Sequence, residues 1–78
     1  MSENIIAGRN SVAEALRSGR SINKIMVQEG AKGGSLGEIL AAAKQQNIML
    51  EYVKAEKLNK LVPGIRHQGI AALVAPIA

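Results

Sequence analysis

Short apolar runs alternate with segments in which apolar residues recur every three to four positions, and this alternation most constrains the fold. Leu36, Ile39, Leu40 and Ala43 follow the helical spacing i, i+3, i+4, i+7. Strands that alternate with helices need crossover connections and favour a largely parallel or mixed sheet covered on both faces. We therefore predict a small three-layer α/β/α domain. The predicted strands are 5–7, 24–28, 48–53 and 70–74, and the predicted helices lie between them.

Polar residues suggest where the first two helices begin. Asn10 or Ser11 is expected to cap the first helix, because a short side-chain oxygen accepts a hydrogen bond from an unpaired backbone N–H. Glu14 stands three residues after Ser11, which is the spacing of a capping box, and Ser35 with Glu38 repeats it.

Other residues suggest where the helices end and which sides they bury. Gly19 and Asn47 are expected to end the first and second helices, since both residue types tolerate a left-handed backbone. The third helix is predicted over 55–62 with Leu58, Leu61 and Val62 facing inward. Pro63 and Gly64 then stop it, and Pro76 marks the end of the last strand.

Charge is the feature of the composition that bears most on function. The 78 residues, enough for one domain spanning 1–78, hold ten Lys and Arg against six acids, a net charge of +4. Such a domain attracts polyanions, although many small basic proteins never meet nucleic acid. The chain has no Cys, no signal-peptide core and no apolar run of the ~20 residues that span a bilayer, so a soluble cytoplasmic protein is expected.

Four segments are candidates for ligand contact. The glycine-rich loop from Glu29 to Ser35 leads into a helix N-terminus, where backbone N–H groups and Lys32 could bind a phosphate. It lacks the Gly-Lys-Ser/Thr of a nucleotide-binding loop, and an ordinary connecting loop would look the same. The three lysines at 54, 57 and 60 form either a phosphate-tracking stripe or a solvated helix face.

The other two segments stand before the last strand and before the first helix. Arg66 could bind a phosphate or stack on a base, and His67 and Gln68 offer donors and acceptors. These side chains could equally hold the loop to its own backbone. Arg9 and Asn10 could contact RNA, or Asn10 could serve only as a cap.

Several kinds of site are not indicated by the sequence. One His without Cys does not make a transition-metal cluster, and no nucleophile stands with a partner base, so neither catalytic nor metal-binding residues are predicted. Tyr52 is the only aromatic residue, which argues against a surface that stacks several bases in a row.

Two segments resemble one family. Ile6–Leu16 (IAGRNSVAEAL) is similar to the start of the SpoU, or TrmH-type, RNA ribose methyltransferases. His67–Ala72 (HQGIAA) resembles the His-Gln-Gly segment that closes their N-terminal substrate-binding domain. Asn10 stands where the family often has His.

The resemblance implies a ribosomal-protein-like α/β/α domain that positions RNA and performs no catalysis itself. It implies a separate knotted domain that binds S-adenosylmethionine, dimerises and methylates a ribose 2′-oxygen, so no cofactor is expected within residues 1–78. The expected partner is RNA, foremost 23S ribosomal RNA, with transfer RNA as the alternative. The expected RNA-binding residues are Arg9, Asn10, Lys32, Arg66, His67 and Gln68.

Two other roles stay open at this point. The domain could pack on its catalytic domain or on a partner without touching RNA, which an exposed apolar patch with few basic neighbours would favour. It could also be a free-standing RNA binder of the ribosomal-protein type.

Overall fold

A mixed β-sheet forms the centre of the molecule, in a computed structural model that describes residues 4–31, 33–63 and 69–75. Within these residues the sheet has four strands in the order β1-β4-β2-β3, accompanied by three helices. The elements in chain order are β1 (Asn4–Ala7), α1 (Arg9–Arg17), β2 (Ile22–Gln28), α2 (Gly34–Gln45), β3 (Met49–Val53), α3 (Ala55–Leu61) and β4 (Ile70–Val74).

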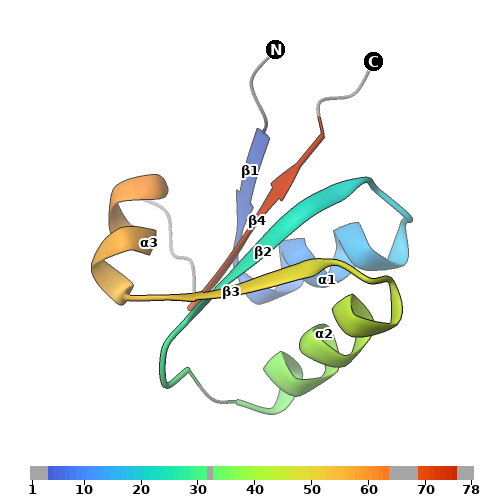
Figure 1. Cartoon of the computed structure of the whole chain (residues 1–78), viewed down its shortest axis with the longest axis horizontal. Helices are drawn as coiled ribbons and strands as arrows, with labels where there is room; N and C mark the ends of the chain where they lie inside the picture. The colour runs from blue at the N-terminus through green and yellow to red at the C-terminus, as the bar shows by residue number, and fades with distance from the viewer. Residues whose placement is uncertain (1–3, 32, 64–68, 76–78) are drawn as a thin grey trace.

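The sequence predicted a largely parallel or mixed sheet, and the observed sheet is mixed. β2 pairs with β3 in parallel, whereas β4 lies between β1 and β2 and is antiparallel to both. Only one of these three pairings is therefore parallel, although the alternation of strands and helices favoured a larger number of parallel pairings. The last strand runs against its neighbours and fills the middle of the sheet, as Figure 1 shows.

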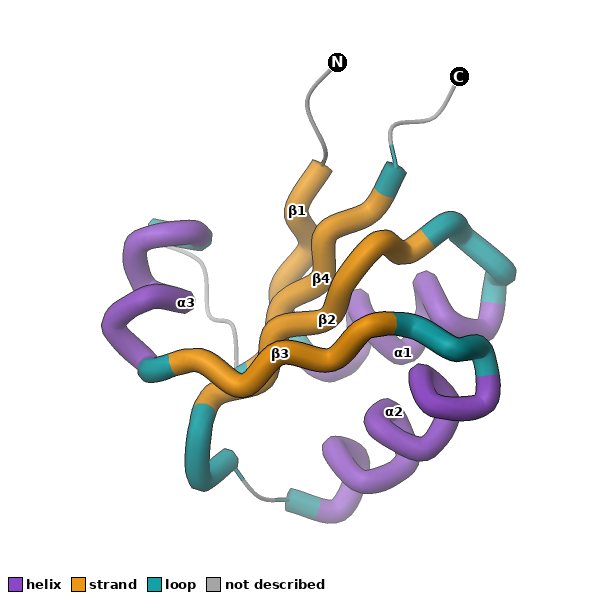
Figure 2. Tube along the Cα trace, viewed as in Figure 1, coloured by secondary structure: helices purple, strands orange, loops and turns teal. Residues whose placement is uncertain are grey.

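Alternating side chains of the strands build two separate apolar clusters. Ile25 and Val27 point to one face, where they meet buried residues of α1 and α2 such as Val12 and Ile39. Met26, one position between them, points to the other face and packs with Leu58 of α3. Figure 2 shows the resulting layers, with α1 and α2 on one side of the sheet and α3 set apart from them.

The predicted ends of the first two helices are confirmed. Gly19 has φ +75°, and Asn47 has φ 58°. After α2 the Ile48 N–H donates to the Ala43 carbonyl at 2.9 Å and the Asn47 N–H donates to Lys44 at 3.1 Å. This pair of bonds is a Schellman motif, which satisfies carbonyls that the helix end would otherwise leave unpaired.

The predicted side-chain caps are wrong. Gly8 and Gly33 occupy the N-cap positions of α1 and α2, and neither helix has a side-chain capping bond. Because α1 begins at Arg9 and α2 at Gly34, the serines proposed as caps lie inside the first helical turn. A hydroxyl inside the first turn is not positioned to accept a hydrogen bond from the unpaired N–H groups at the helix start. The two predicted capping boxes, Ser11 with Glu14 and Ser35 with Glu38, therefore do not form.

The third helix is also only partly as predicted. Leu58 and Val62 are fully buried, but Leu61 is 39% exposed. At about 100° per residue, Leu61 lies about 60° round the helix from Leu58, on the side away from Val62. The sheet covers the Val62 side of this short helix and leaves Leu61 in solvent. None of the helices in the described part of the chain is long and apolar enough to cross a membrane.

Candidate nucleic-acid interface

One end of the sheet gathers the segments that the sequence singled out. The Gly8 N–H donates to the Ile70 carbonyl at 3.1 Å, and the Gln28 N–H donates to the Gly69 carbonyl at 2.8 Å. The Glu29 N–H donates to the Val53 carbonyl at 2.8 Å. The start of α1, the loop after β2, the end of β3 and the start of β4 therefore meet at one place, toward the lower left of Figure 1.

Arg9 joins two of these segments through its side chain. Its guanidinium lies against Gly33, so that a Cβ built at position 33 would overlap it. Gly33 has φ +150°, a conformation that side-chain-bearing residues rarely adopt. The arginine of the first segment thus stands at the N-terminus of α2, where the helix dipole also favours negative charge and the first turn holds no acidic residue.

Gly69 holds the start of β4 close to the loop after β2. Its φ is +82°, and a Cβ there would lie 3.2 Å from the Cβ of Ala31 and 3.6 Å from that of Gln28. A side chain at this position would meet both backbone strain and crowding. The fold itself therefore favours glycine at this position of the His-Gln-Gly segment, independently of any RNA contact.

The remaining predicted contact residues divide into two groups. Asn10 is exposed in the first turn of α1, at the same end of the sheet as Arg9. The others, Lys32, Arg66, His67 and Gln68, lie outside the described residues.

The three lysines near α3 do not act as one uniform stripe. Lys57 donates to Glu51 Oε2 at 3.3 Å, and Lys24 of β2 donates to Oε1 of the same carboxylate at 2.7 Å. The hydrogen bond from Lys24, followed by that from Lys57, holds the pKa of Glu51 below its ordinary value. All three lysines are exposed, but Lys57 also ties α3 to the sheet through its ion pair with Glu51.

A groove lies between α1 and α2, and its chemistry differs from that of the gathered segments. This groove has a volume of about 300 Å³, and Leu16, Ile39 and two alanines supply apolar walls. Arg17 and Glu38 stand among its lining residues, and the Gln46 side-chain amide donates to the Leu16 carbonyl at 3.2 Å. No cluster of His, Cys, Asp or Glu suited to a metal ion occurs in the part of the chain that the structure describes.

Sequence reasoning missed one exposed residue beside the gathered segments. Tyr52 precedes Val53 at the end of β3, and 57% of it is exposed. Its exposure follows from the place of β3 at the edge of the sheet, which only the strand order reveals.

Solved structures share the fold at low sequence identity. A protein of unknown function from Bacillus halodurans aligns with 88% of this chain and 69% of its own, with a TM-score of 0.70 and 14% identity. An archaeal translation termination factor aligns with 90% of this chain and 19% of its own, with a TM-score of 0.62 and 23% identity.

Curated relatives are closer in sequence. A protein of Staphylococcus aureus described as "Putative TrmH family tRNA/rRNA methyltransferase" is 46% identical over 76 residues, which are 97% of this chain and 30% of the relative. Proteins of the same description from Staphylococcus haemolyticus and Staphylococcus epidermidis are 43% and 45% identical over the same share. The chain thus spans about a third of the length of these relatives.

The family described as RNA 2′-O ribose methyltransferase substrate binding matches residues 5–78, nearly the whole chain. This match agrees with the resemblance carried by the two terminal segments, and those segments are hydrogen-bonded to each other in the fold through Gly8 and Ile70. The chain belongs to the family of substrate-binding domains of RNA 2′-O ribose methyltransferases.

Proposed function

We propose that this chain holds RNA for a TrmH-type ribose 2′-O-methyltransferase and leaves the methyl transfer to another part of that enzyme. The observation that carries the proposal is the family match over residues 5–78. Relatives at 46% identity described as tRNA/rRNA methyltransferases support it. The net charge of +4 gives the domain the electrostatic attraction to a phosphate backbone that such a role needs.

The RNA-facing surface of this proposal is the end of the sheet where the four segments meet. Arg9 stands beside the N-terminus of α2, so a guanidinium and a helix dipole favour an anion at the same place. Asn10 is exposed next to it. The proposed RNA contacts are Arg9 and Asn10 on this surface, together with Lys32, Arg66, His67 and Gln68, which lie outside the described residues.

The wider setting of the proposal follows from the family. S-adenosylmethionine would be bound by the part of the parent enzyme outside this domain, and the parent would act as a homodimer in the cytoplasm. The proposed substrate is 23S ribosomal RNA. Competition between a 23S fragment and transfer RNA for the domain checks this choice: tighter binding of transfer RNA would reverse it.

The main experiment compares two arginines of one helix. Arg9 begins α1 at the gathered segments, and Arg17 ends the same helix, as its matched control. With fluorescently labelled ribosomal RNA, Arg9→Gln should weaken binding and lower the slope of log K against log salt by about 1, whereas Arg17→Gln should change neither.

Three results of this experiment are decisive for the proposal. Loss of affinity confined to Arg9→Gln supports the proposed surface. Equal losses in both variants would mean that diffuse charge binds RNA and that the surface is wrong. No RNA binding by the unaltered chain at low salt would overturn the function itself.

The groove between α1 and α2 favours a second role, as a surface that packs on the catalytic domain. Its walls are largely apolar, and only Arg17 among its lining residues is basic. Ala42→Glu would place a charge in this groove without altering the sheet end. If it disrupts a full-length enzyme while RNA binding to the 78-residue chain is unchanged, the groove holds the two domains together.

A further inference from the structure

Tyr52 is a large side chain exposed at the edge of the sheet. It is the only aromatic residue of the sequence, and 57% of it is exposed. It lies on β3, which forms the edge of the sheet and pairs only with β2. Tyrosine combines a broad apolar ring with a polar hydroxyl and is enriched where proteins contact other molecules, so an exposed tyrosine is a candidate contact residue.

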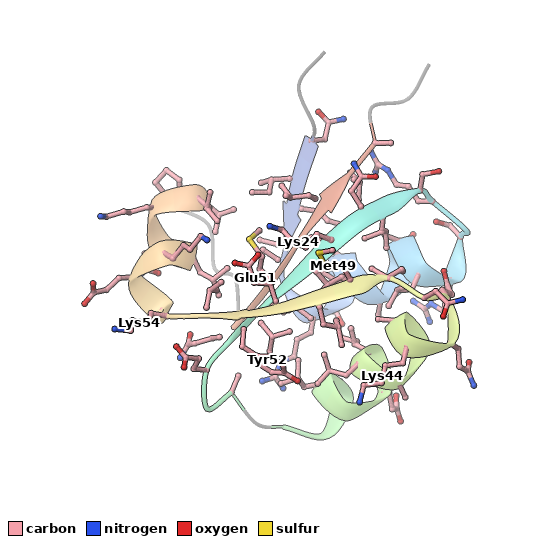
Figure 3. All side chains as sticks on the ribbon, viewed as in Figure 1. Lys24, Lys44, Met49, Glu51, Tyr52 and Lys54 are labelled. Carbon is pink, nitrogen blue, oxygen red and sulfur yellow. The ribbon has the colours of Figure 1, made fainter. Side chains whose placement is uncertain are left out.

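The strand register fixes the direction of the ring. Tyr52 is the partner of Val27, whose side chain belongs to the cluster packed against α1 and α2. Partners in neighbouring strands point to the same face, so the ring lies on the side of the sheet that carries α2. Figure 3 shows Tyr52 on this side of β3.

The part of α2 that lies toward the β3 edge is open. The α2 residues that line the groove with α1, such as Glu38 and Ala42, lie on the α1 side of the helix. Gly37 and Lys44 are seven residues apart, hence aligned along the helix, and lie on the opposite side from that groove. A Cβ built on Gly37 would have nothing within 4 Å. This side of the helix therefore carries no side chain at position 37 that would cover it.

Two exposed lysines lie on the same side of the sheet as the ring. Lys54 follows two residues later with φ −76° and ψ 153°, so the extended backbone turns it to the same side as Tyr52. Lys44 is exposed on the β3-facing side of α2. The end of β3 also adjoins the gathered segments, because the Val53 carbonyl accepts the Glu29 N–H.

We propose that Tyr52 stacks on one unpaired base of the bound RNA, with Lys54 and Lys44 close to the flanking phosphates. This inference rests on the proposed RNA-binding function and adds to it the form of RNA recognised. A duplex keeps its bases stacked on one another, so a lone exposed ring selects a loop, a bulge or a strand end. A single aromatic residue provides a platform for one base and not for a series.

The sequence supplies the probe for a direct test. The chain contains no Trp and only one Tyr, so its tyrosine fluorescence reports on Tyr52 alone. Titration with a single-stranded RNA hexamer should quench this emission, with correction for RNA absorbance against N-acetyltyrosinamide. The quenching should saturate at the dissociation constant that anisotropy of labelled RNA gives, and a blunt duplex should quench far less.

Substitutions then separate stacking from other roles of the ring. Tyr52→Phe should bind the hexamer within about twofold of the unaltered chain, whereas Tyr52→Leu should bind about 5- to 150-fold more weakly. Met49→Ala is the matched control, because Met49 is 65% exposed on the same strand and three residues away, hence on the opposite face. It should leave affinity unchanged, and circular dichroism checks the fold of each variant.

The outcomes distinguish this inference from the function on which it rests. If the chain binds RNA but the Tyr52 emission is unchanged and Tyr52→Leu binds normally, stacking is refuted and RNA recognition stands. If Tyr52→Leu alters the sedimentation of the chain and not its RNA affinity, the ring packs on a second copy and the proposal falls. Absence of any RNA binding overturns both.

Discussion

The guanidinium of Arg9 lies against Gly33, so the first residue of α1 touches the residue that precedes α2. The two positions are 24 residues apart in the chain, and the contact joins the start of one helix to the start of the other. It depends on the absence of a side chain at position 33 and on a backbone that glycine adopts readily.

Gly33→Ala is expected to reduce RNA binding more than its effect on stability would suggest. The new methyl group overlaps the Arg9 guanidinium and displaces it, and the backbone strain costs about 1–3 kcal/mol. Gly30→Ala is the control: its φ of +81° is also strained, but no atom lies within 4 Å of the added Cβ. Both should lower the urea midpoint, and only Gly33→Ala should lower RNA affinity; equal affinities would mean that the position of Arg9 is unimportant.

Gly69→Ala should destabilise the fold more than Gly19→Ala. The two glycines have similar backbones, with φ +82° and +75°. A Cβ at position 69 comes within 3.2 Å of Ala31, whereas one at position 19 meets nothing within 4 Å. The strain of about 1–3 kcal/mol is therefore common to both, and overpacking adds about 1–3 kcal/mol at position 69 alone. Urea unfolding measures the difference, and equal losses would contradict the packing argument.

Leu58→Ala should show how strongly α3 is attached. Leu58 is fully buried on the second face of the sheet and its truncation should cost about 2–5 kcal/mol in the free energy of unfolding. Leu61→Ala removes the same atoms from a side chain that is 39% exposed, and should cost less than about 1 kcal/mol. Comparable losses would show that Leu61 is packed after all.

The ion pairs of Glu51 should make stability depend on pH in acid. Because the folded-state pKa of Glu51 is lowered, its contribution is present above the ordinary value of 4.5 and is lost as the pH falls through the folded value. The difference in unfolding midpoint between the unaltered chain and Glu51→Gln should therefore shrink below about pH 4.5. The effect should be modest and weakened by salt, since the carboxylate is well solvated.

The two lysines should contribute unequally to this shift. Lys24 Nζ lies 2.7 Å from the carboxylate and Lys57 Nζ lies 3.3 Å from it. Carbon-detected NMR titration of Glu51 should give a larger rise in its pKa for Lys24→Gln than for Lys57→Gln. A larger rise with Lys57→Gln would reverse the assignment of the stronger partner.

Local spacing predicted most of the elements of this fold. The period of Leu36, Ile39 and Ala43 predicted α2, and the run that forms β4 was predicted with its observed bounds, Ile70–Val74. Gly19 and Asn47 were correctly predicted as helix ends because their left-handed backbone is a local property. The N-caps were not, since a serine two residues into a helix has the same neighbours in sequence as a serine that caps one.

The strand order could not be read in the same way. The sequence alone does not tell whether β4 joins the edge of the sheet or enters between β1 and β2, because both arrangements bury Ile70 and Ala72. The candidate interface depends on that order. The segments around Gly8, Gln28 and Gly69 are far apart in the sequence, and only the pairing of β4 with both neighbours brings them together.

The central place of β4 also governs how the chain acquires its structure during synthesis. Among the described strands β1 pairs with β4 alone, so β1 has no partner in the sheet until β4 has been synthesised. A nascent chain that has emerged only to the end of α3 lacks β4, whose side chains belong to both apolar clusters. Folding of the domain is therefore coupled to emergence of residues 70–74 from the ribosome, and a pause before that point would leave β2 exposed along one edge.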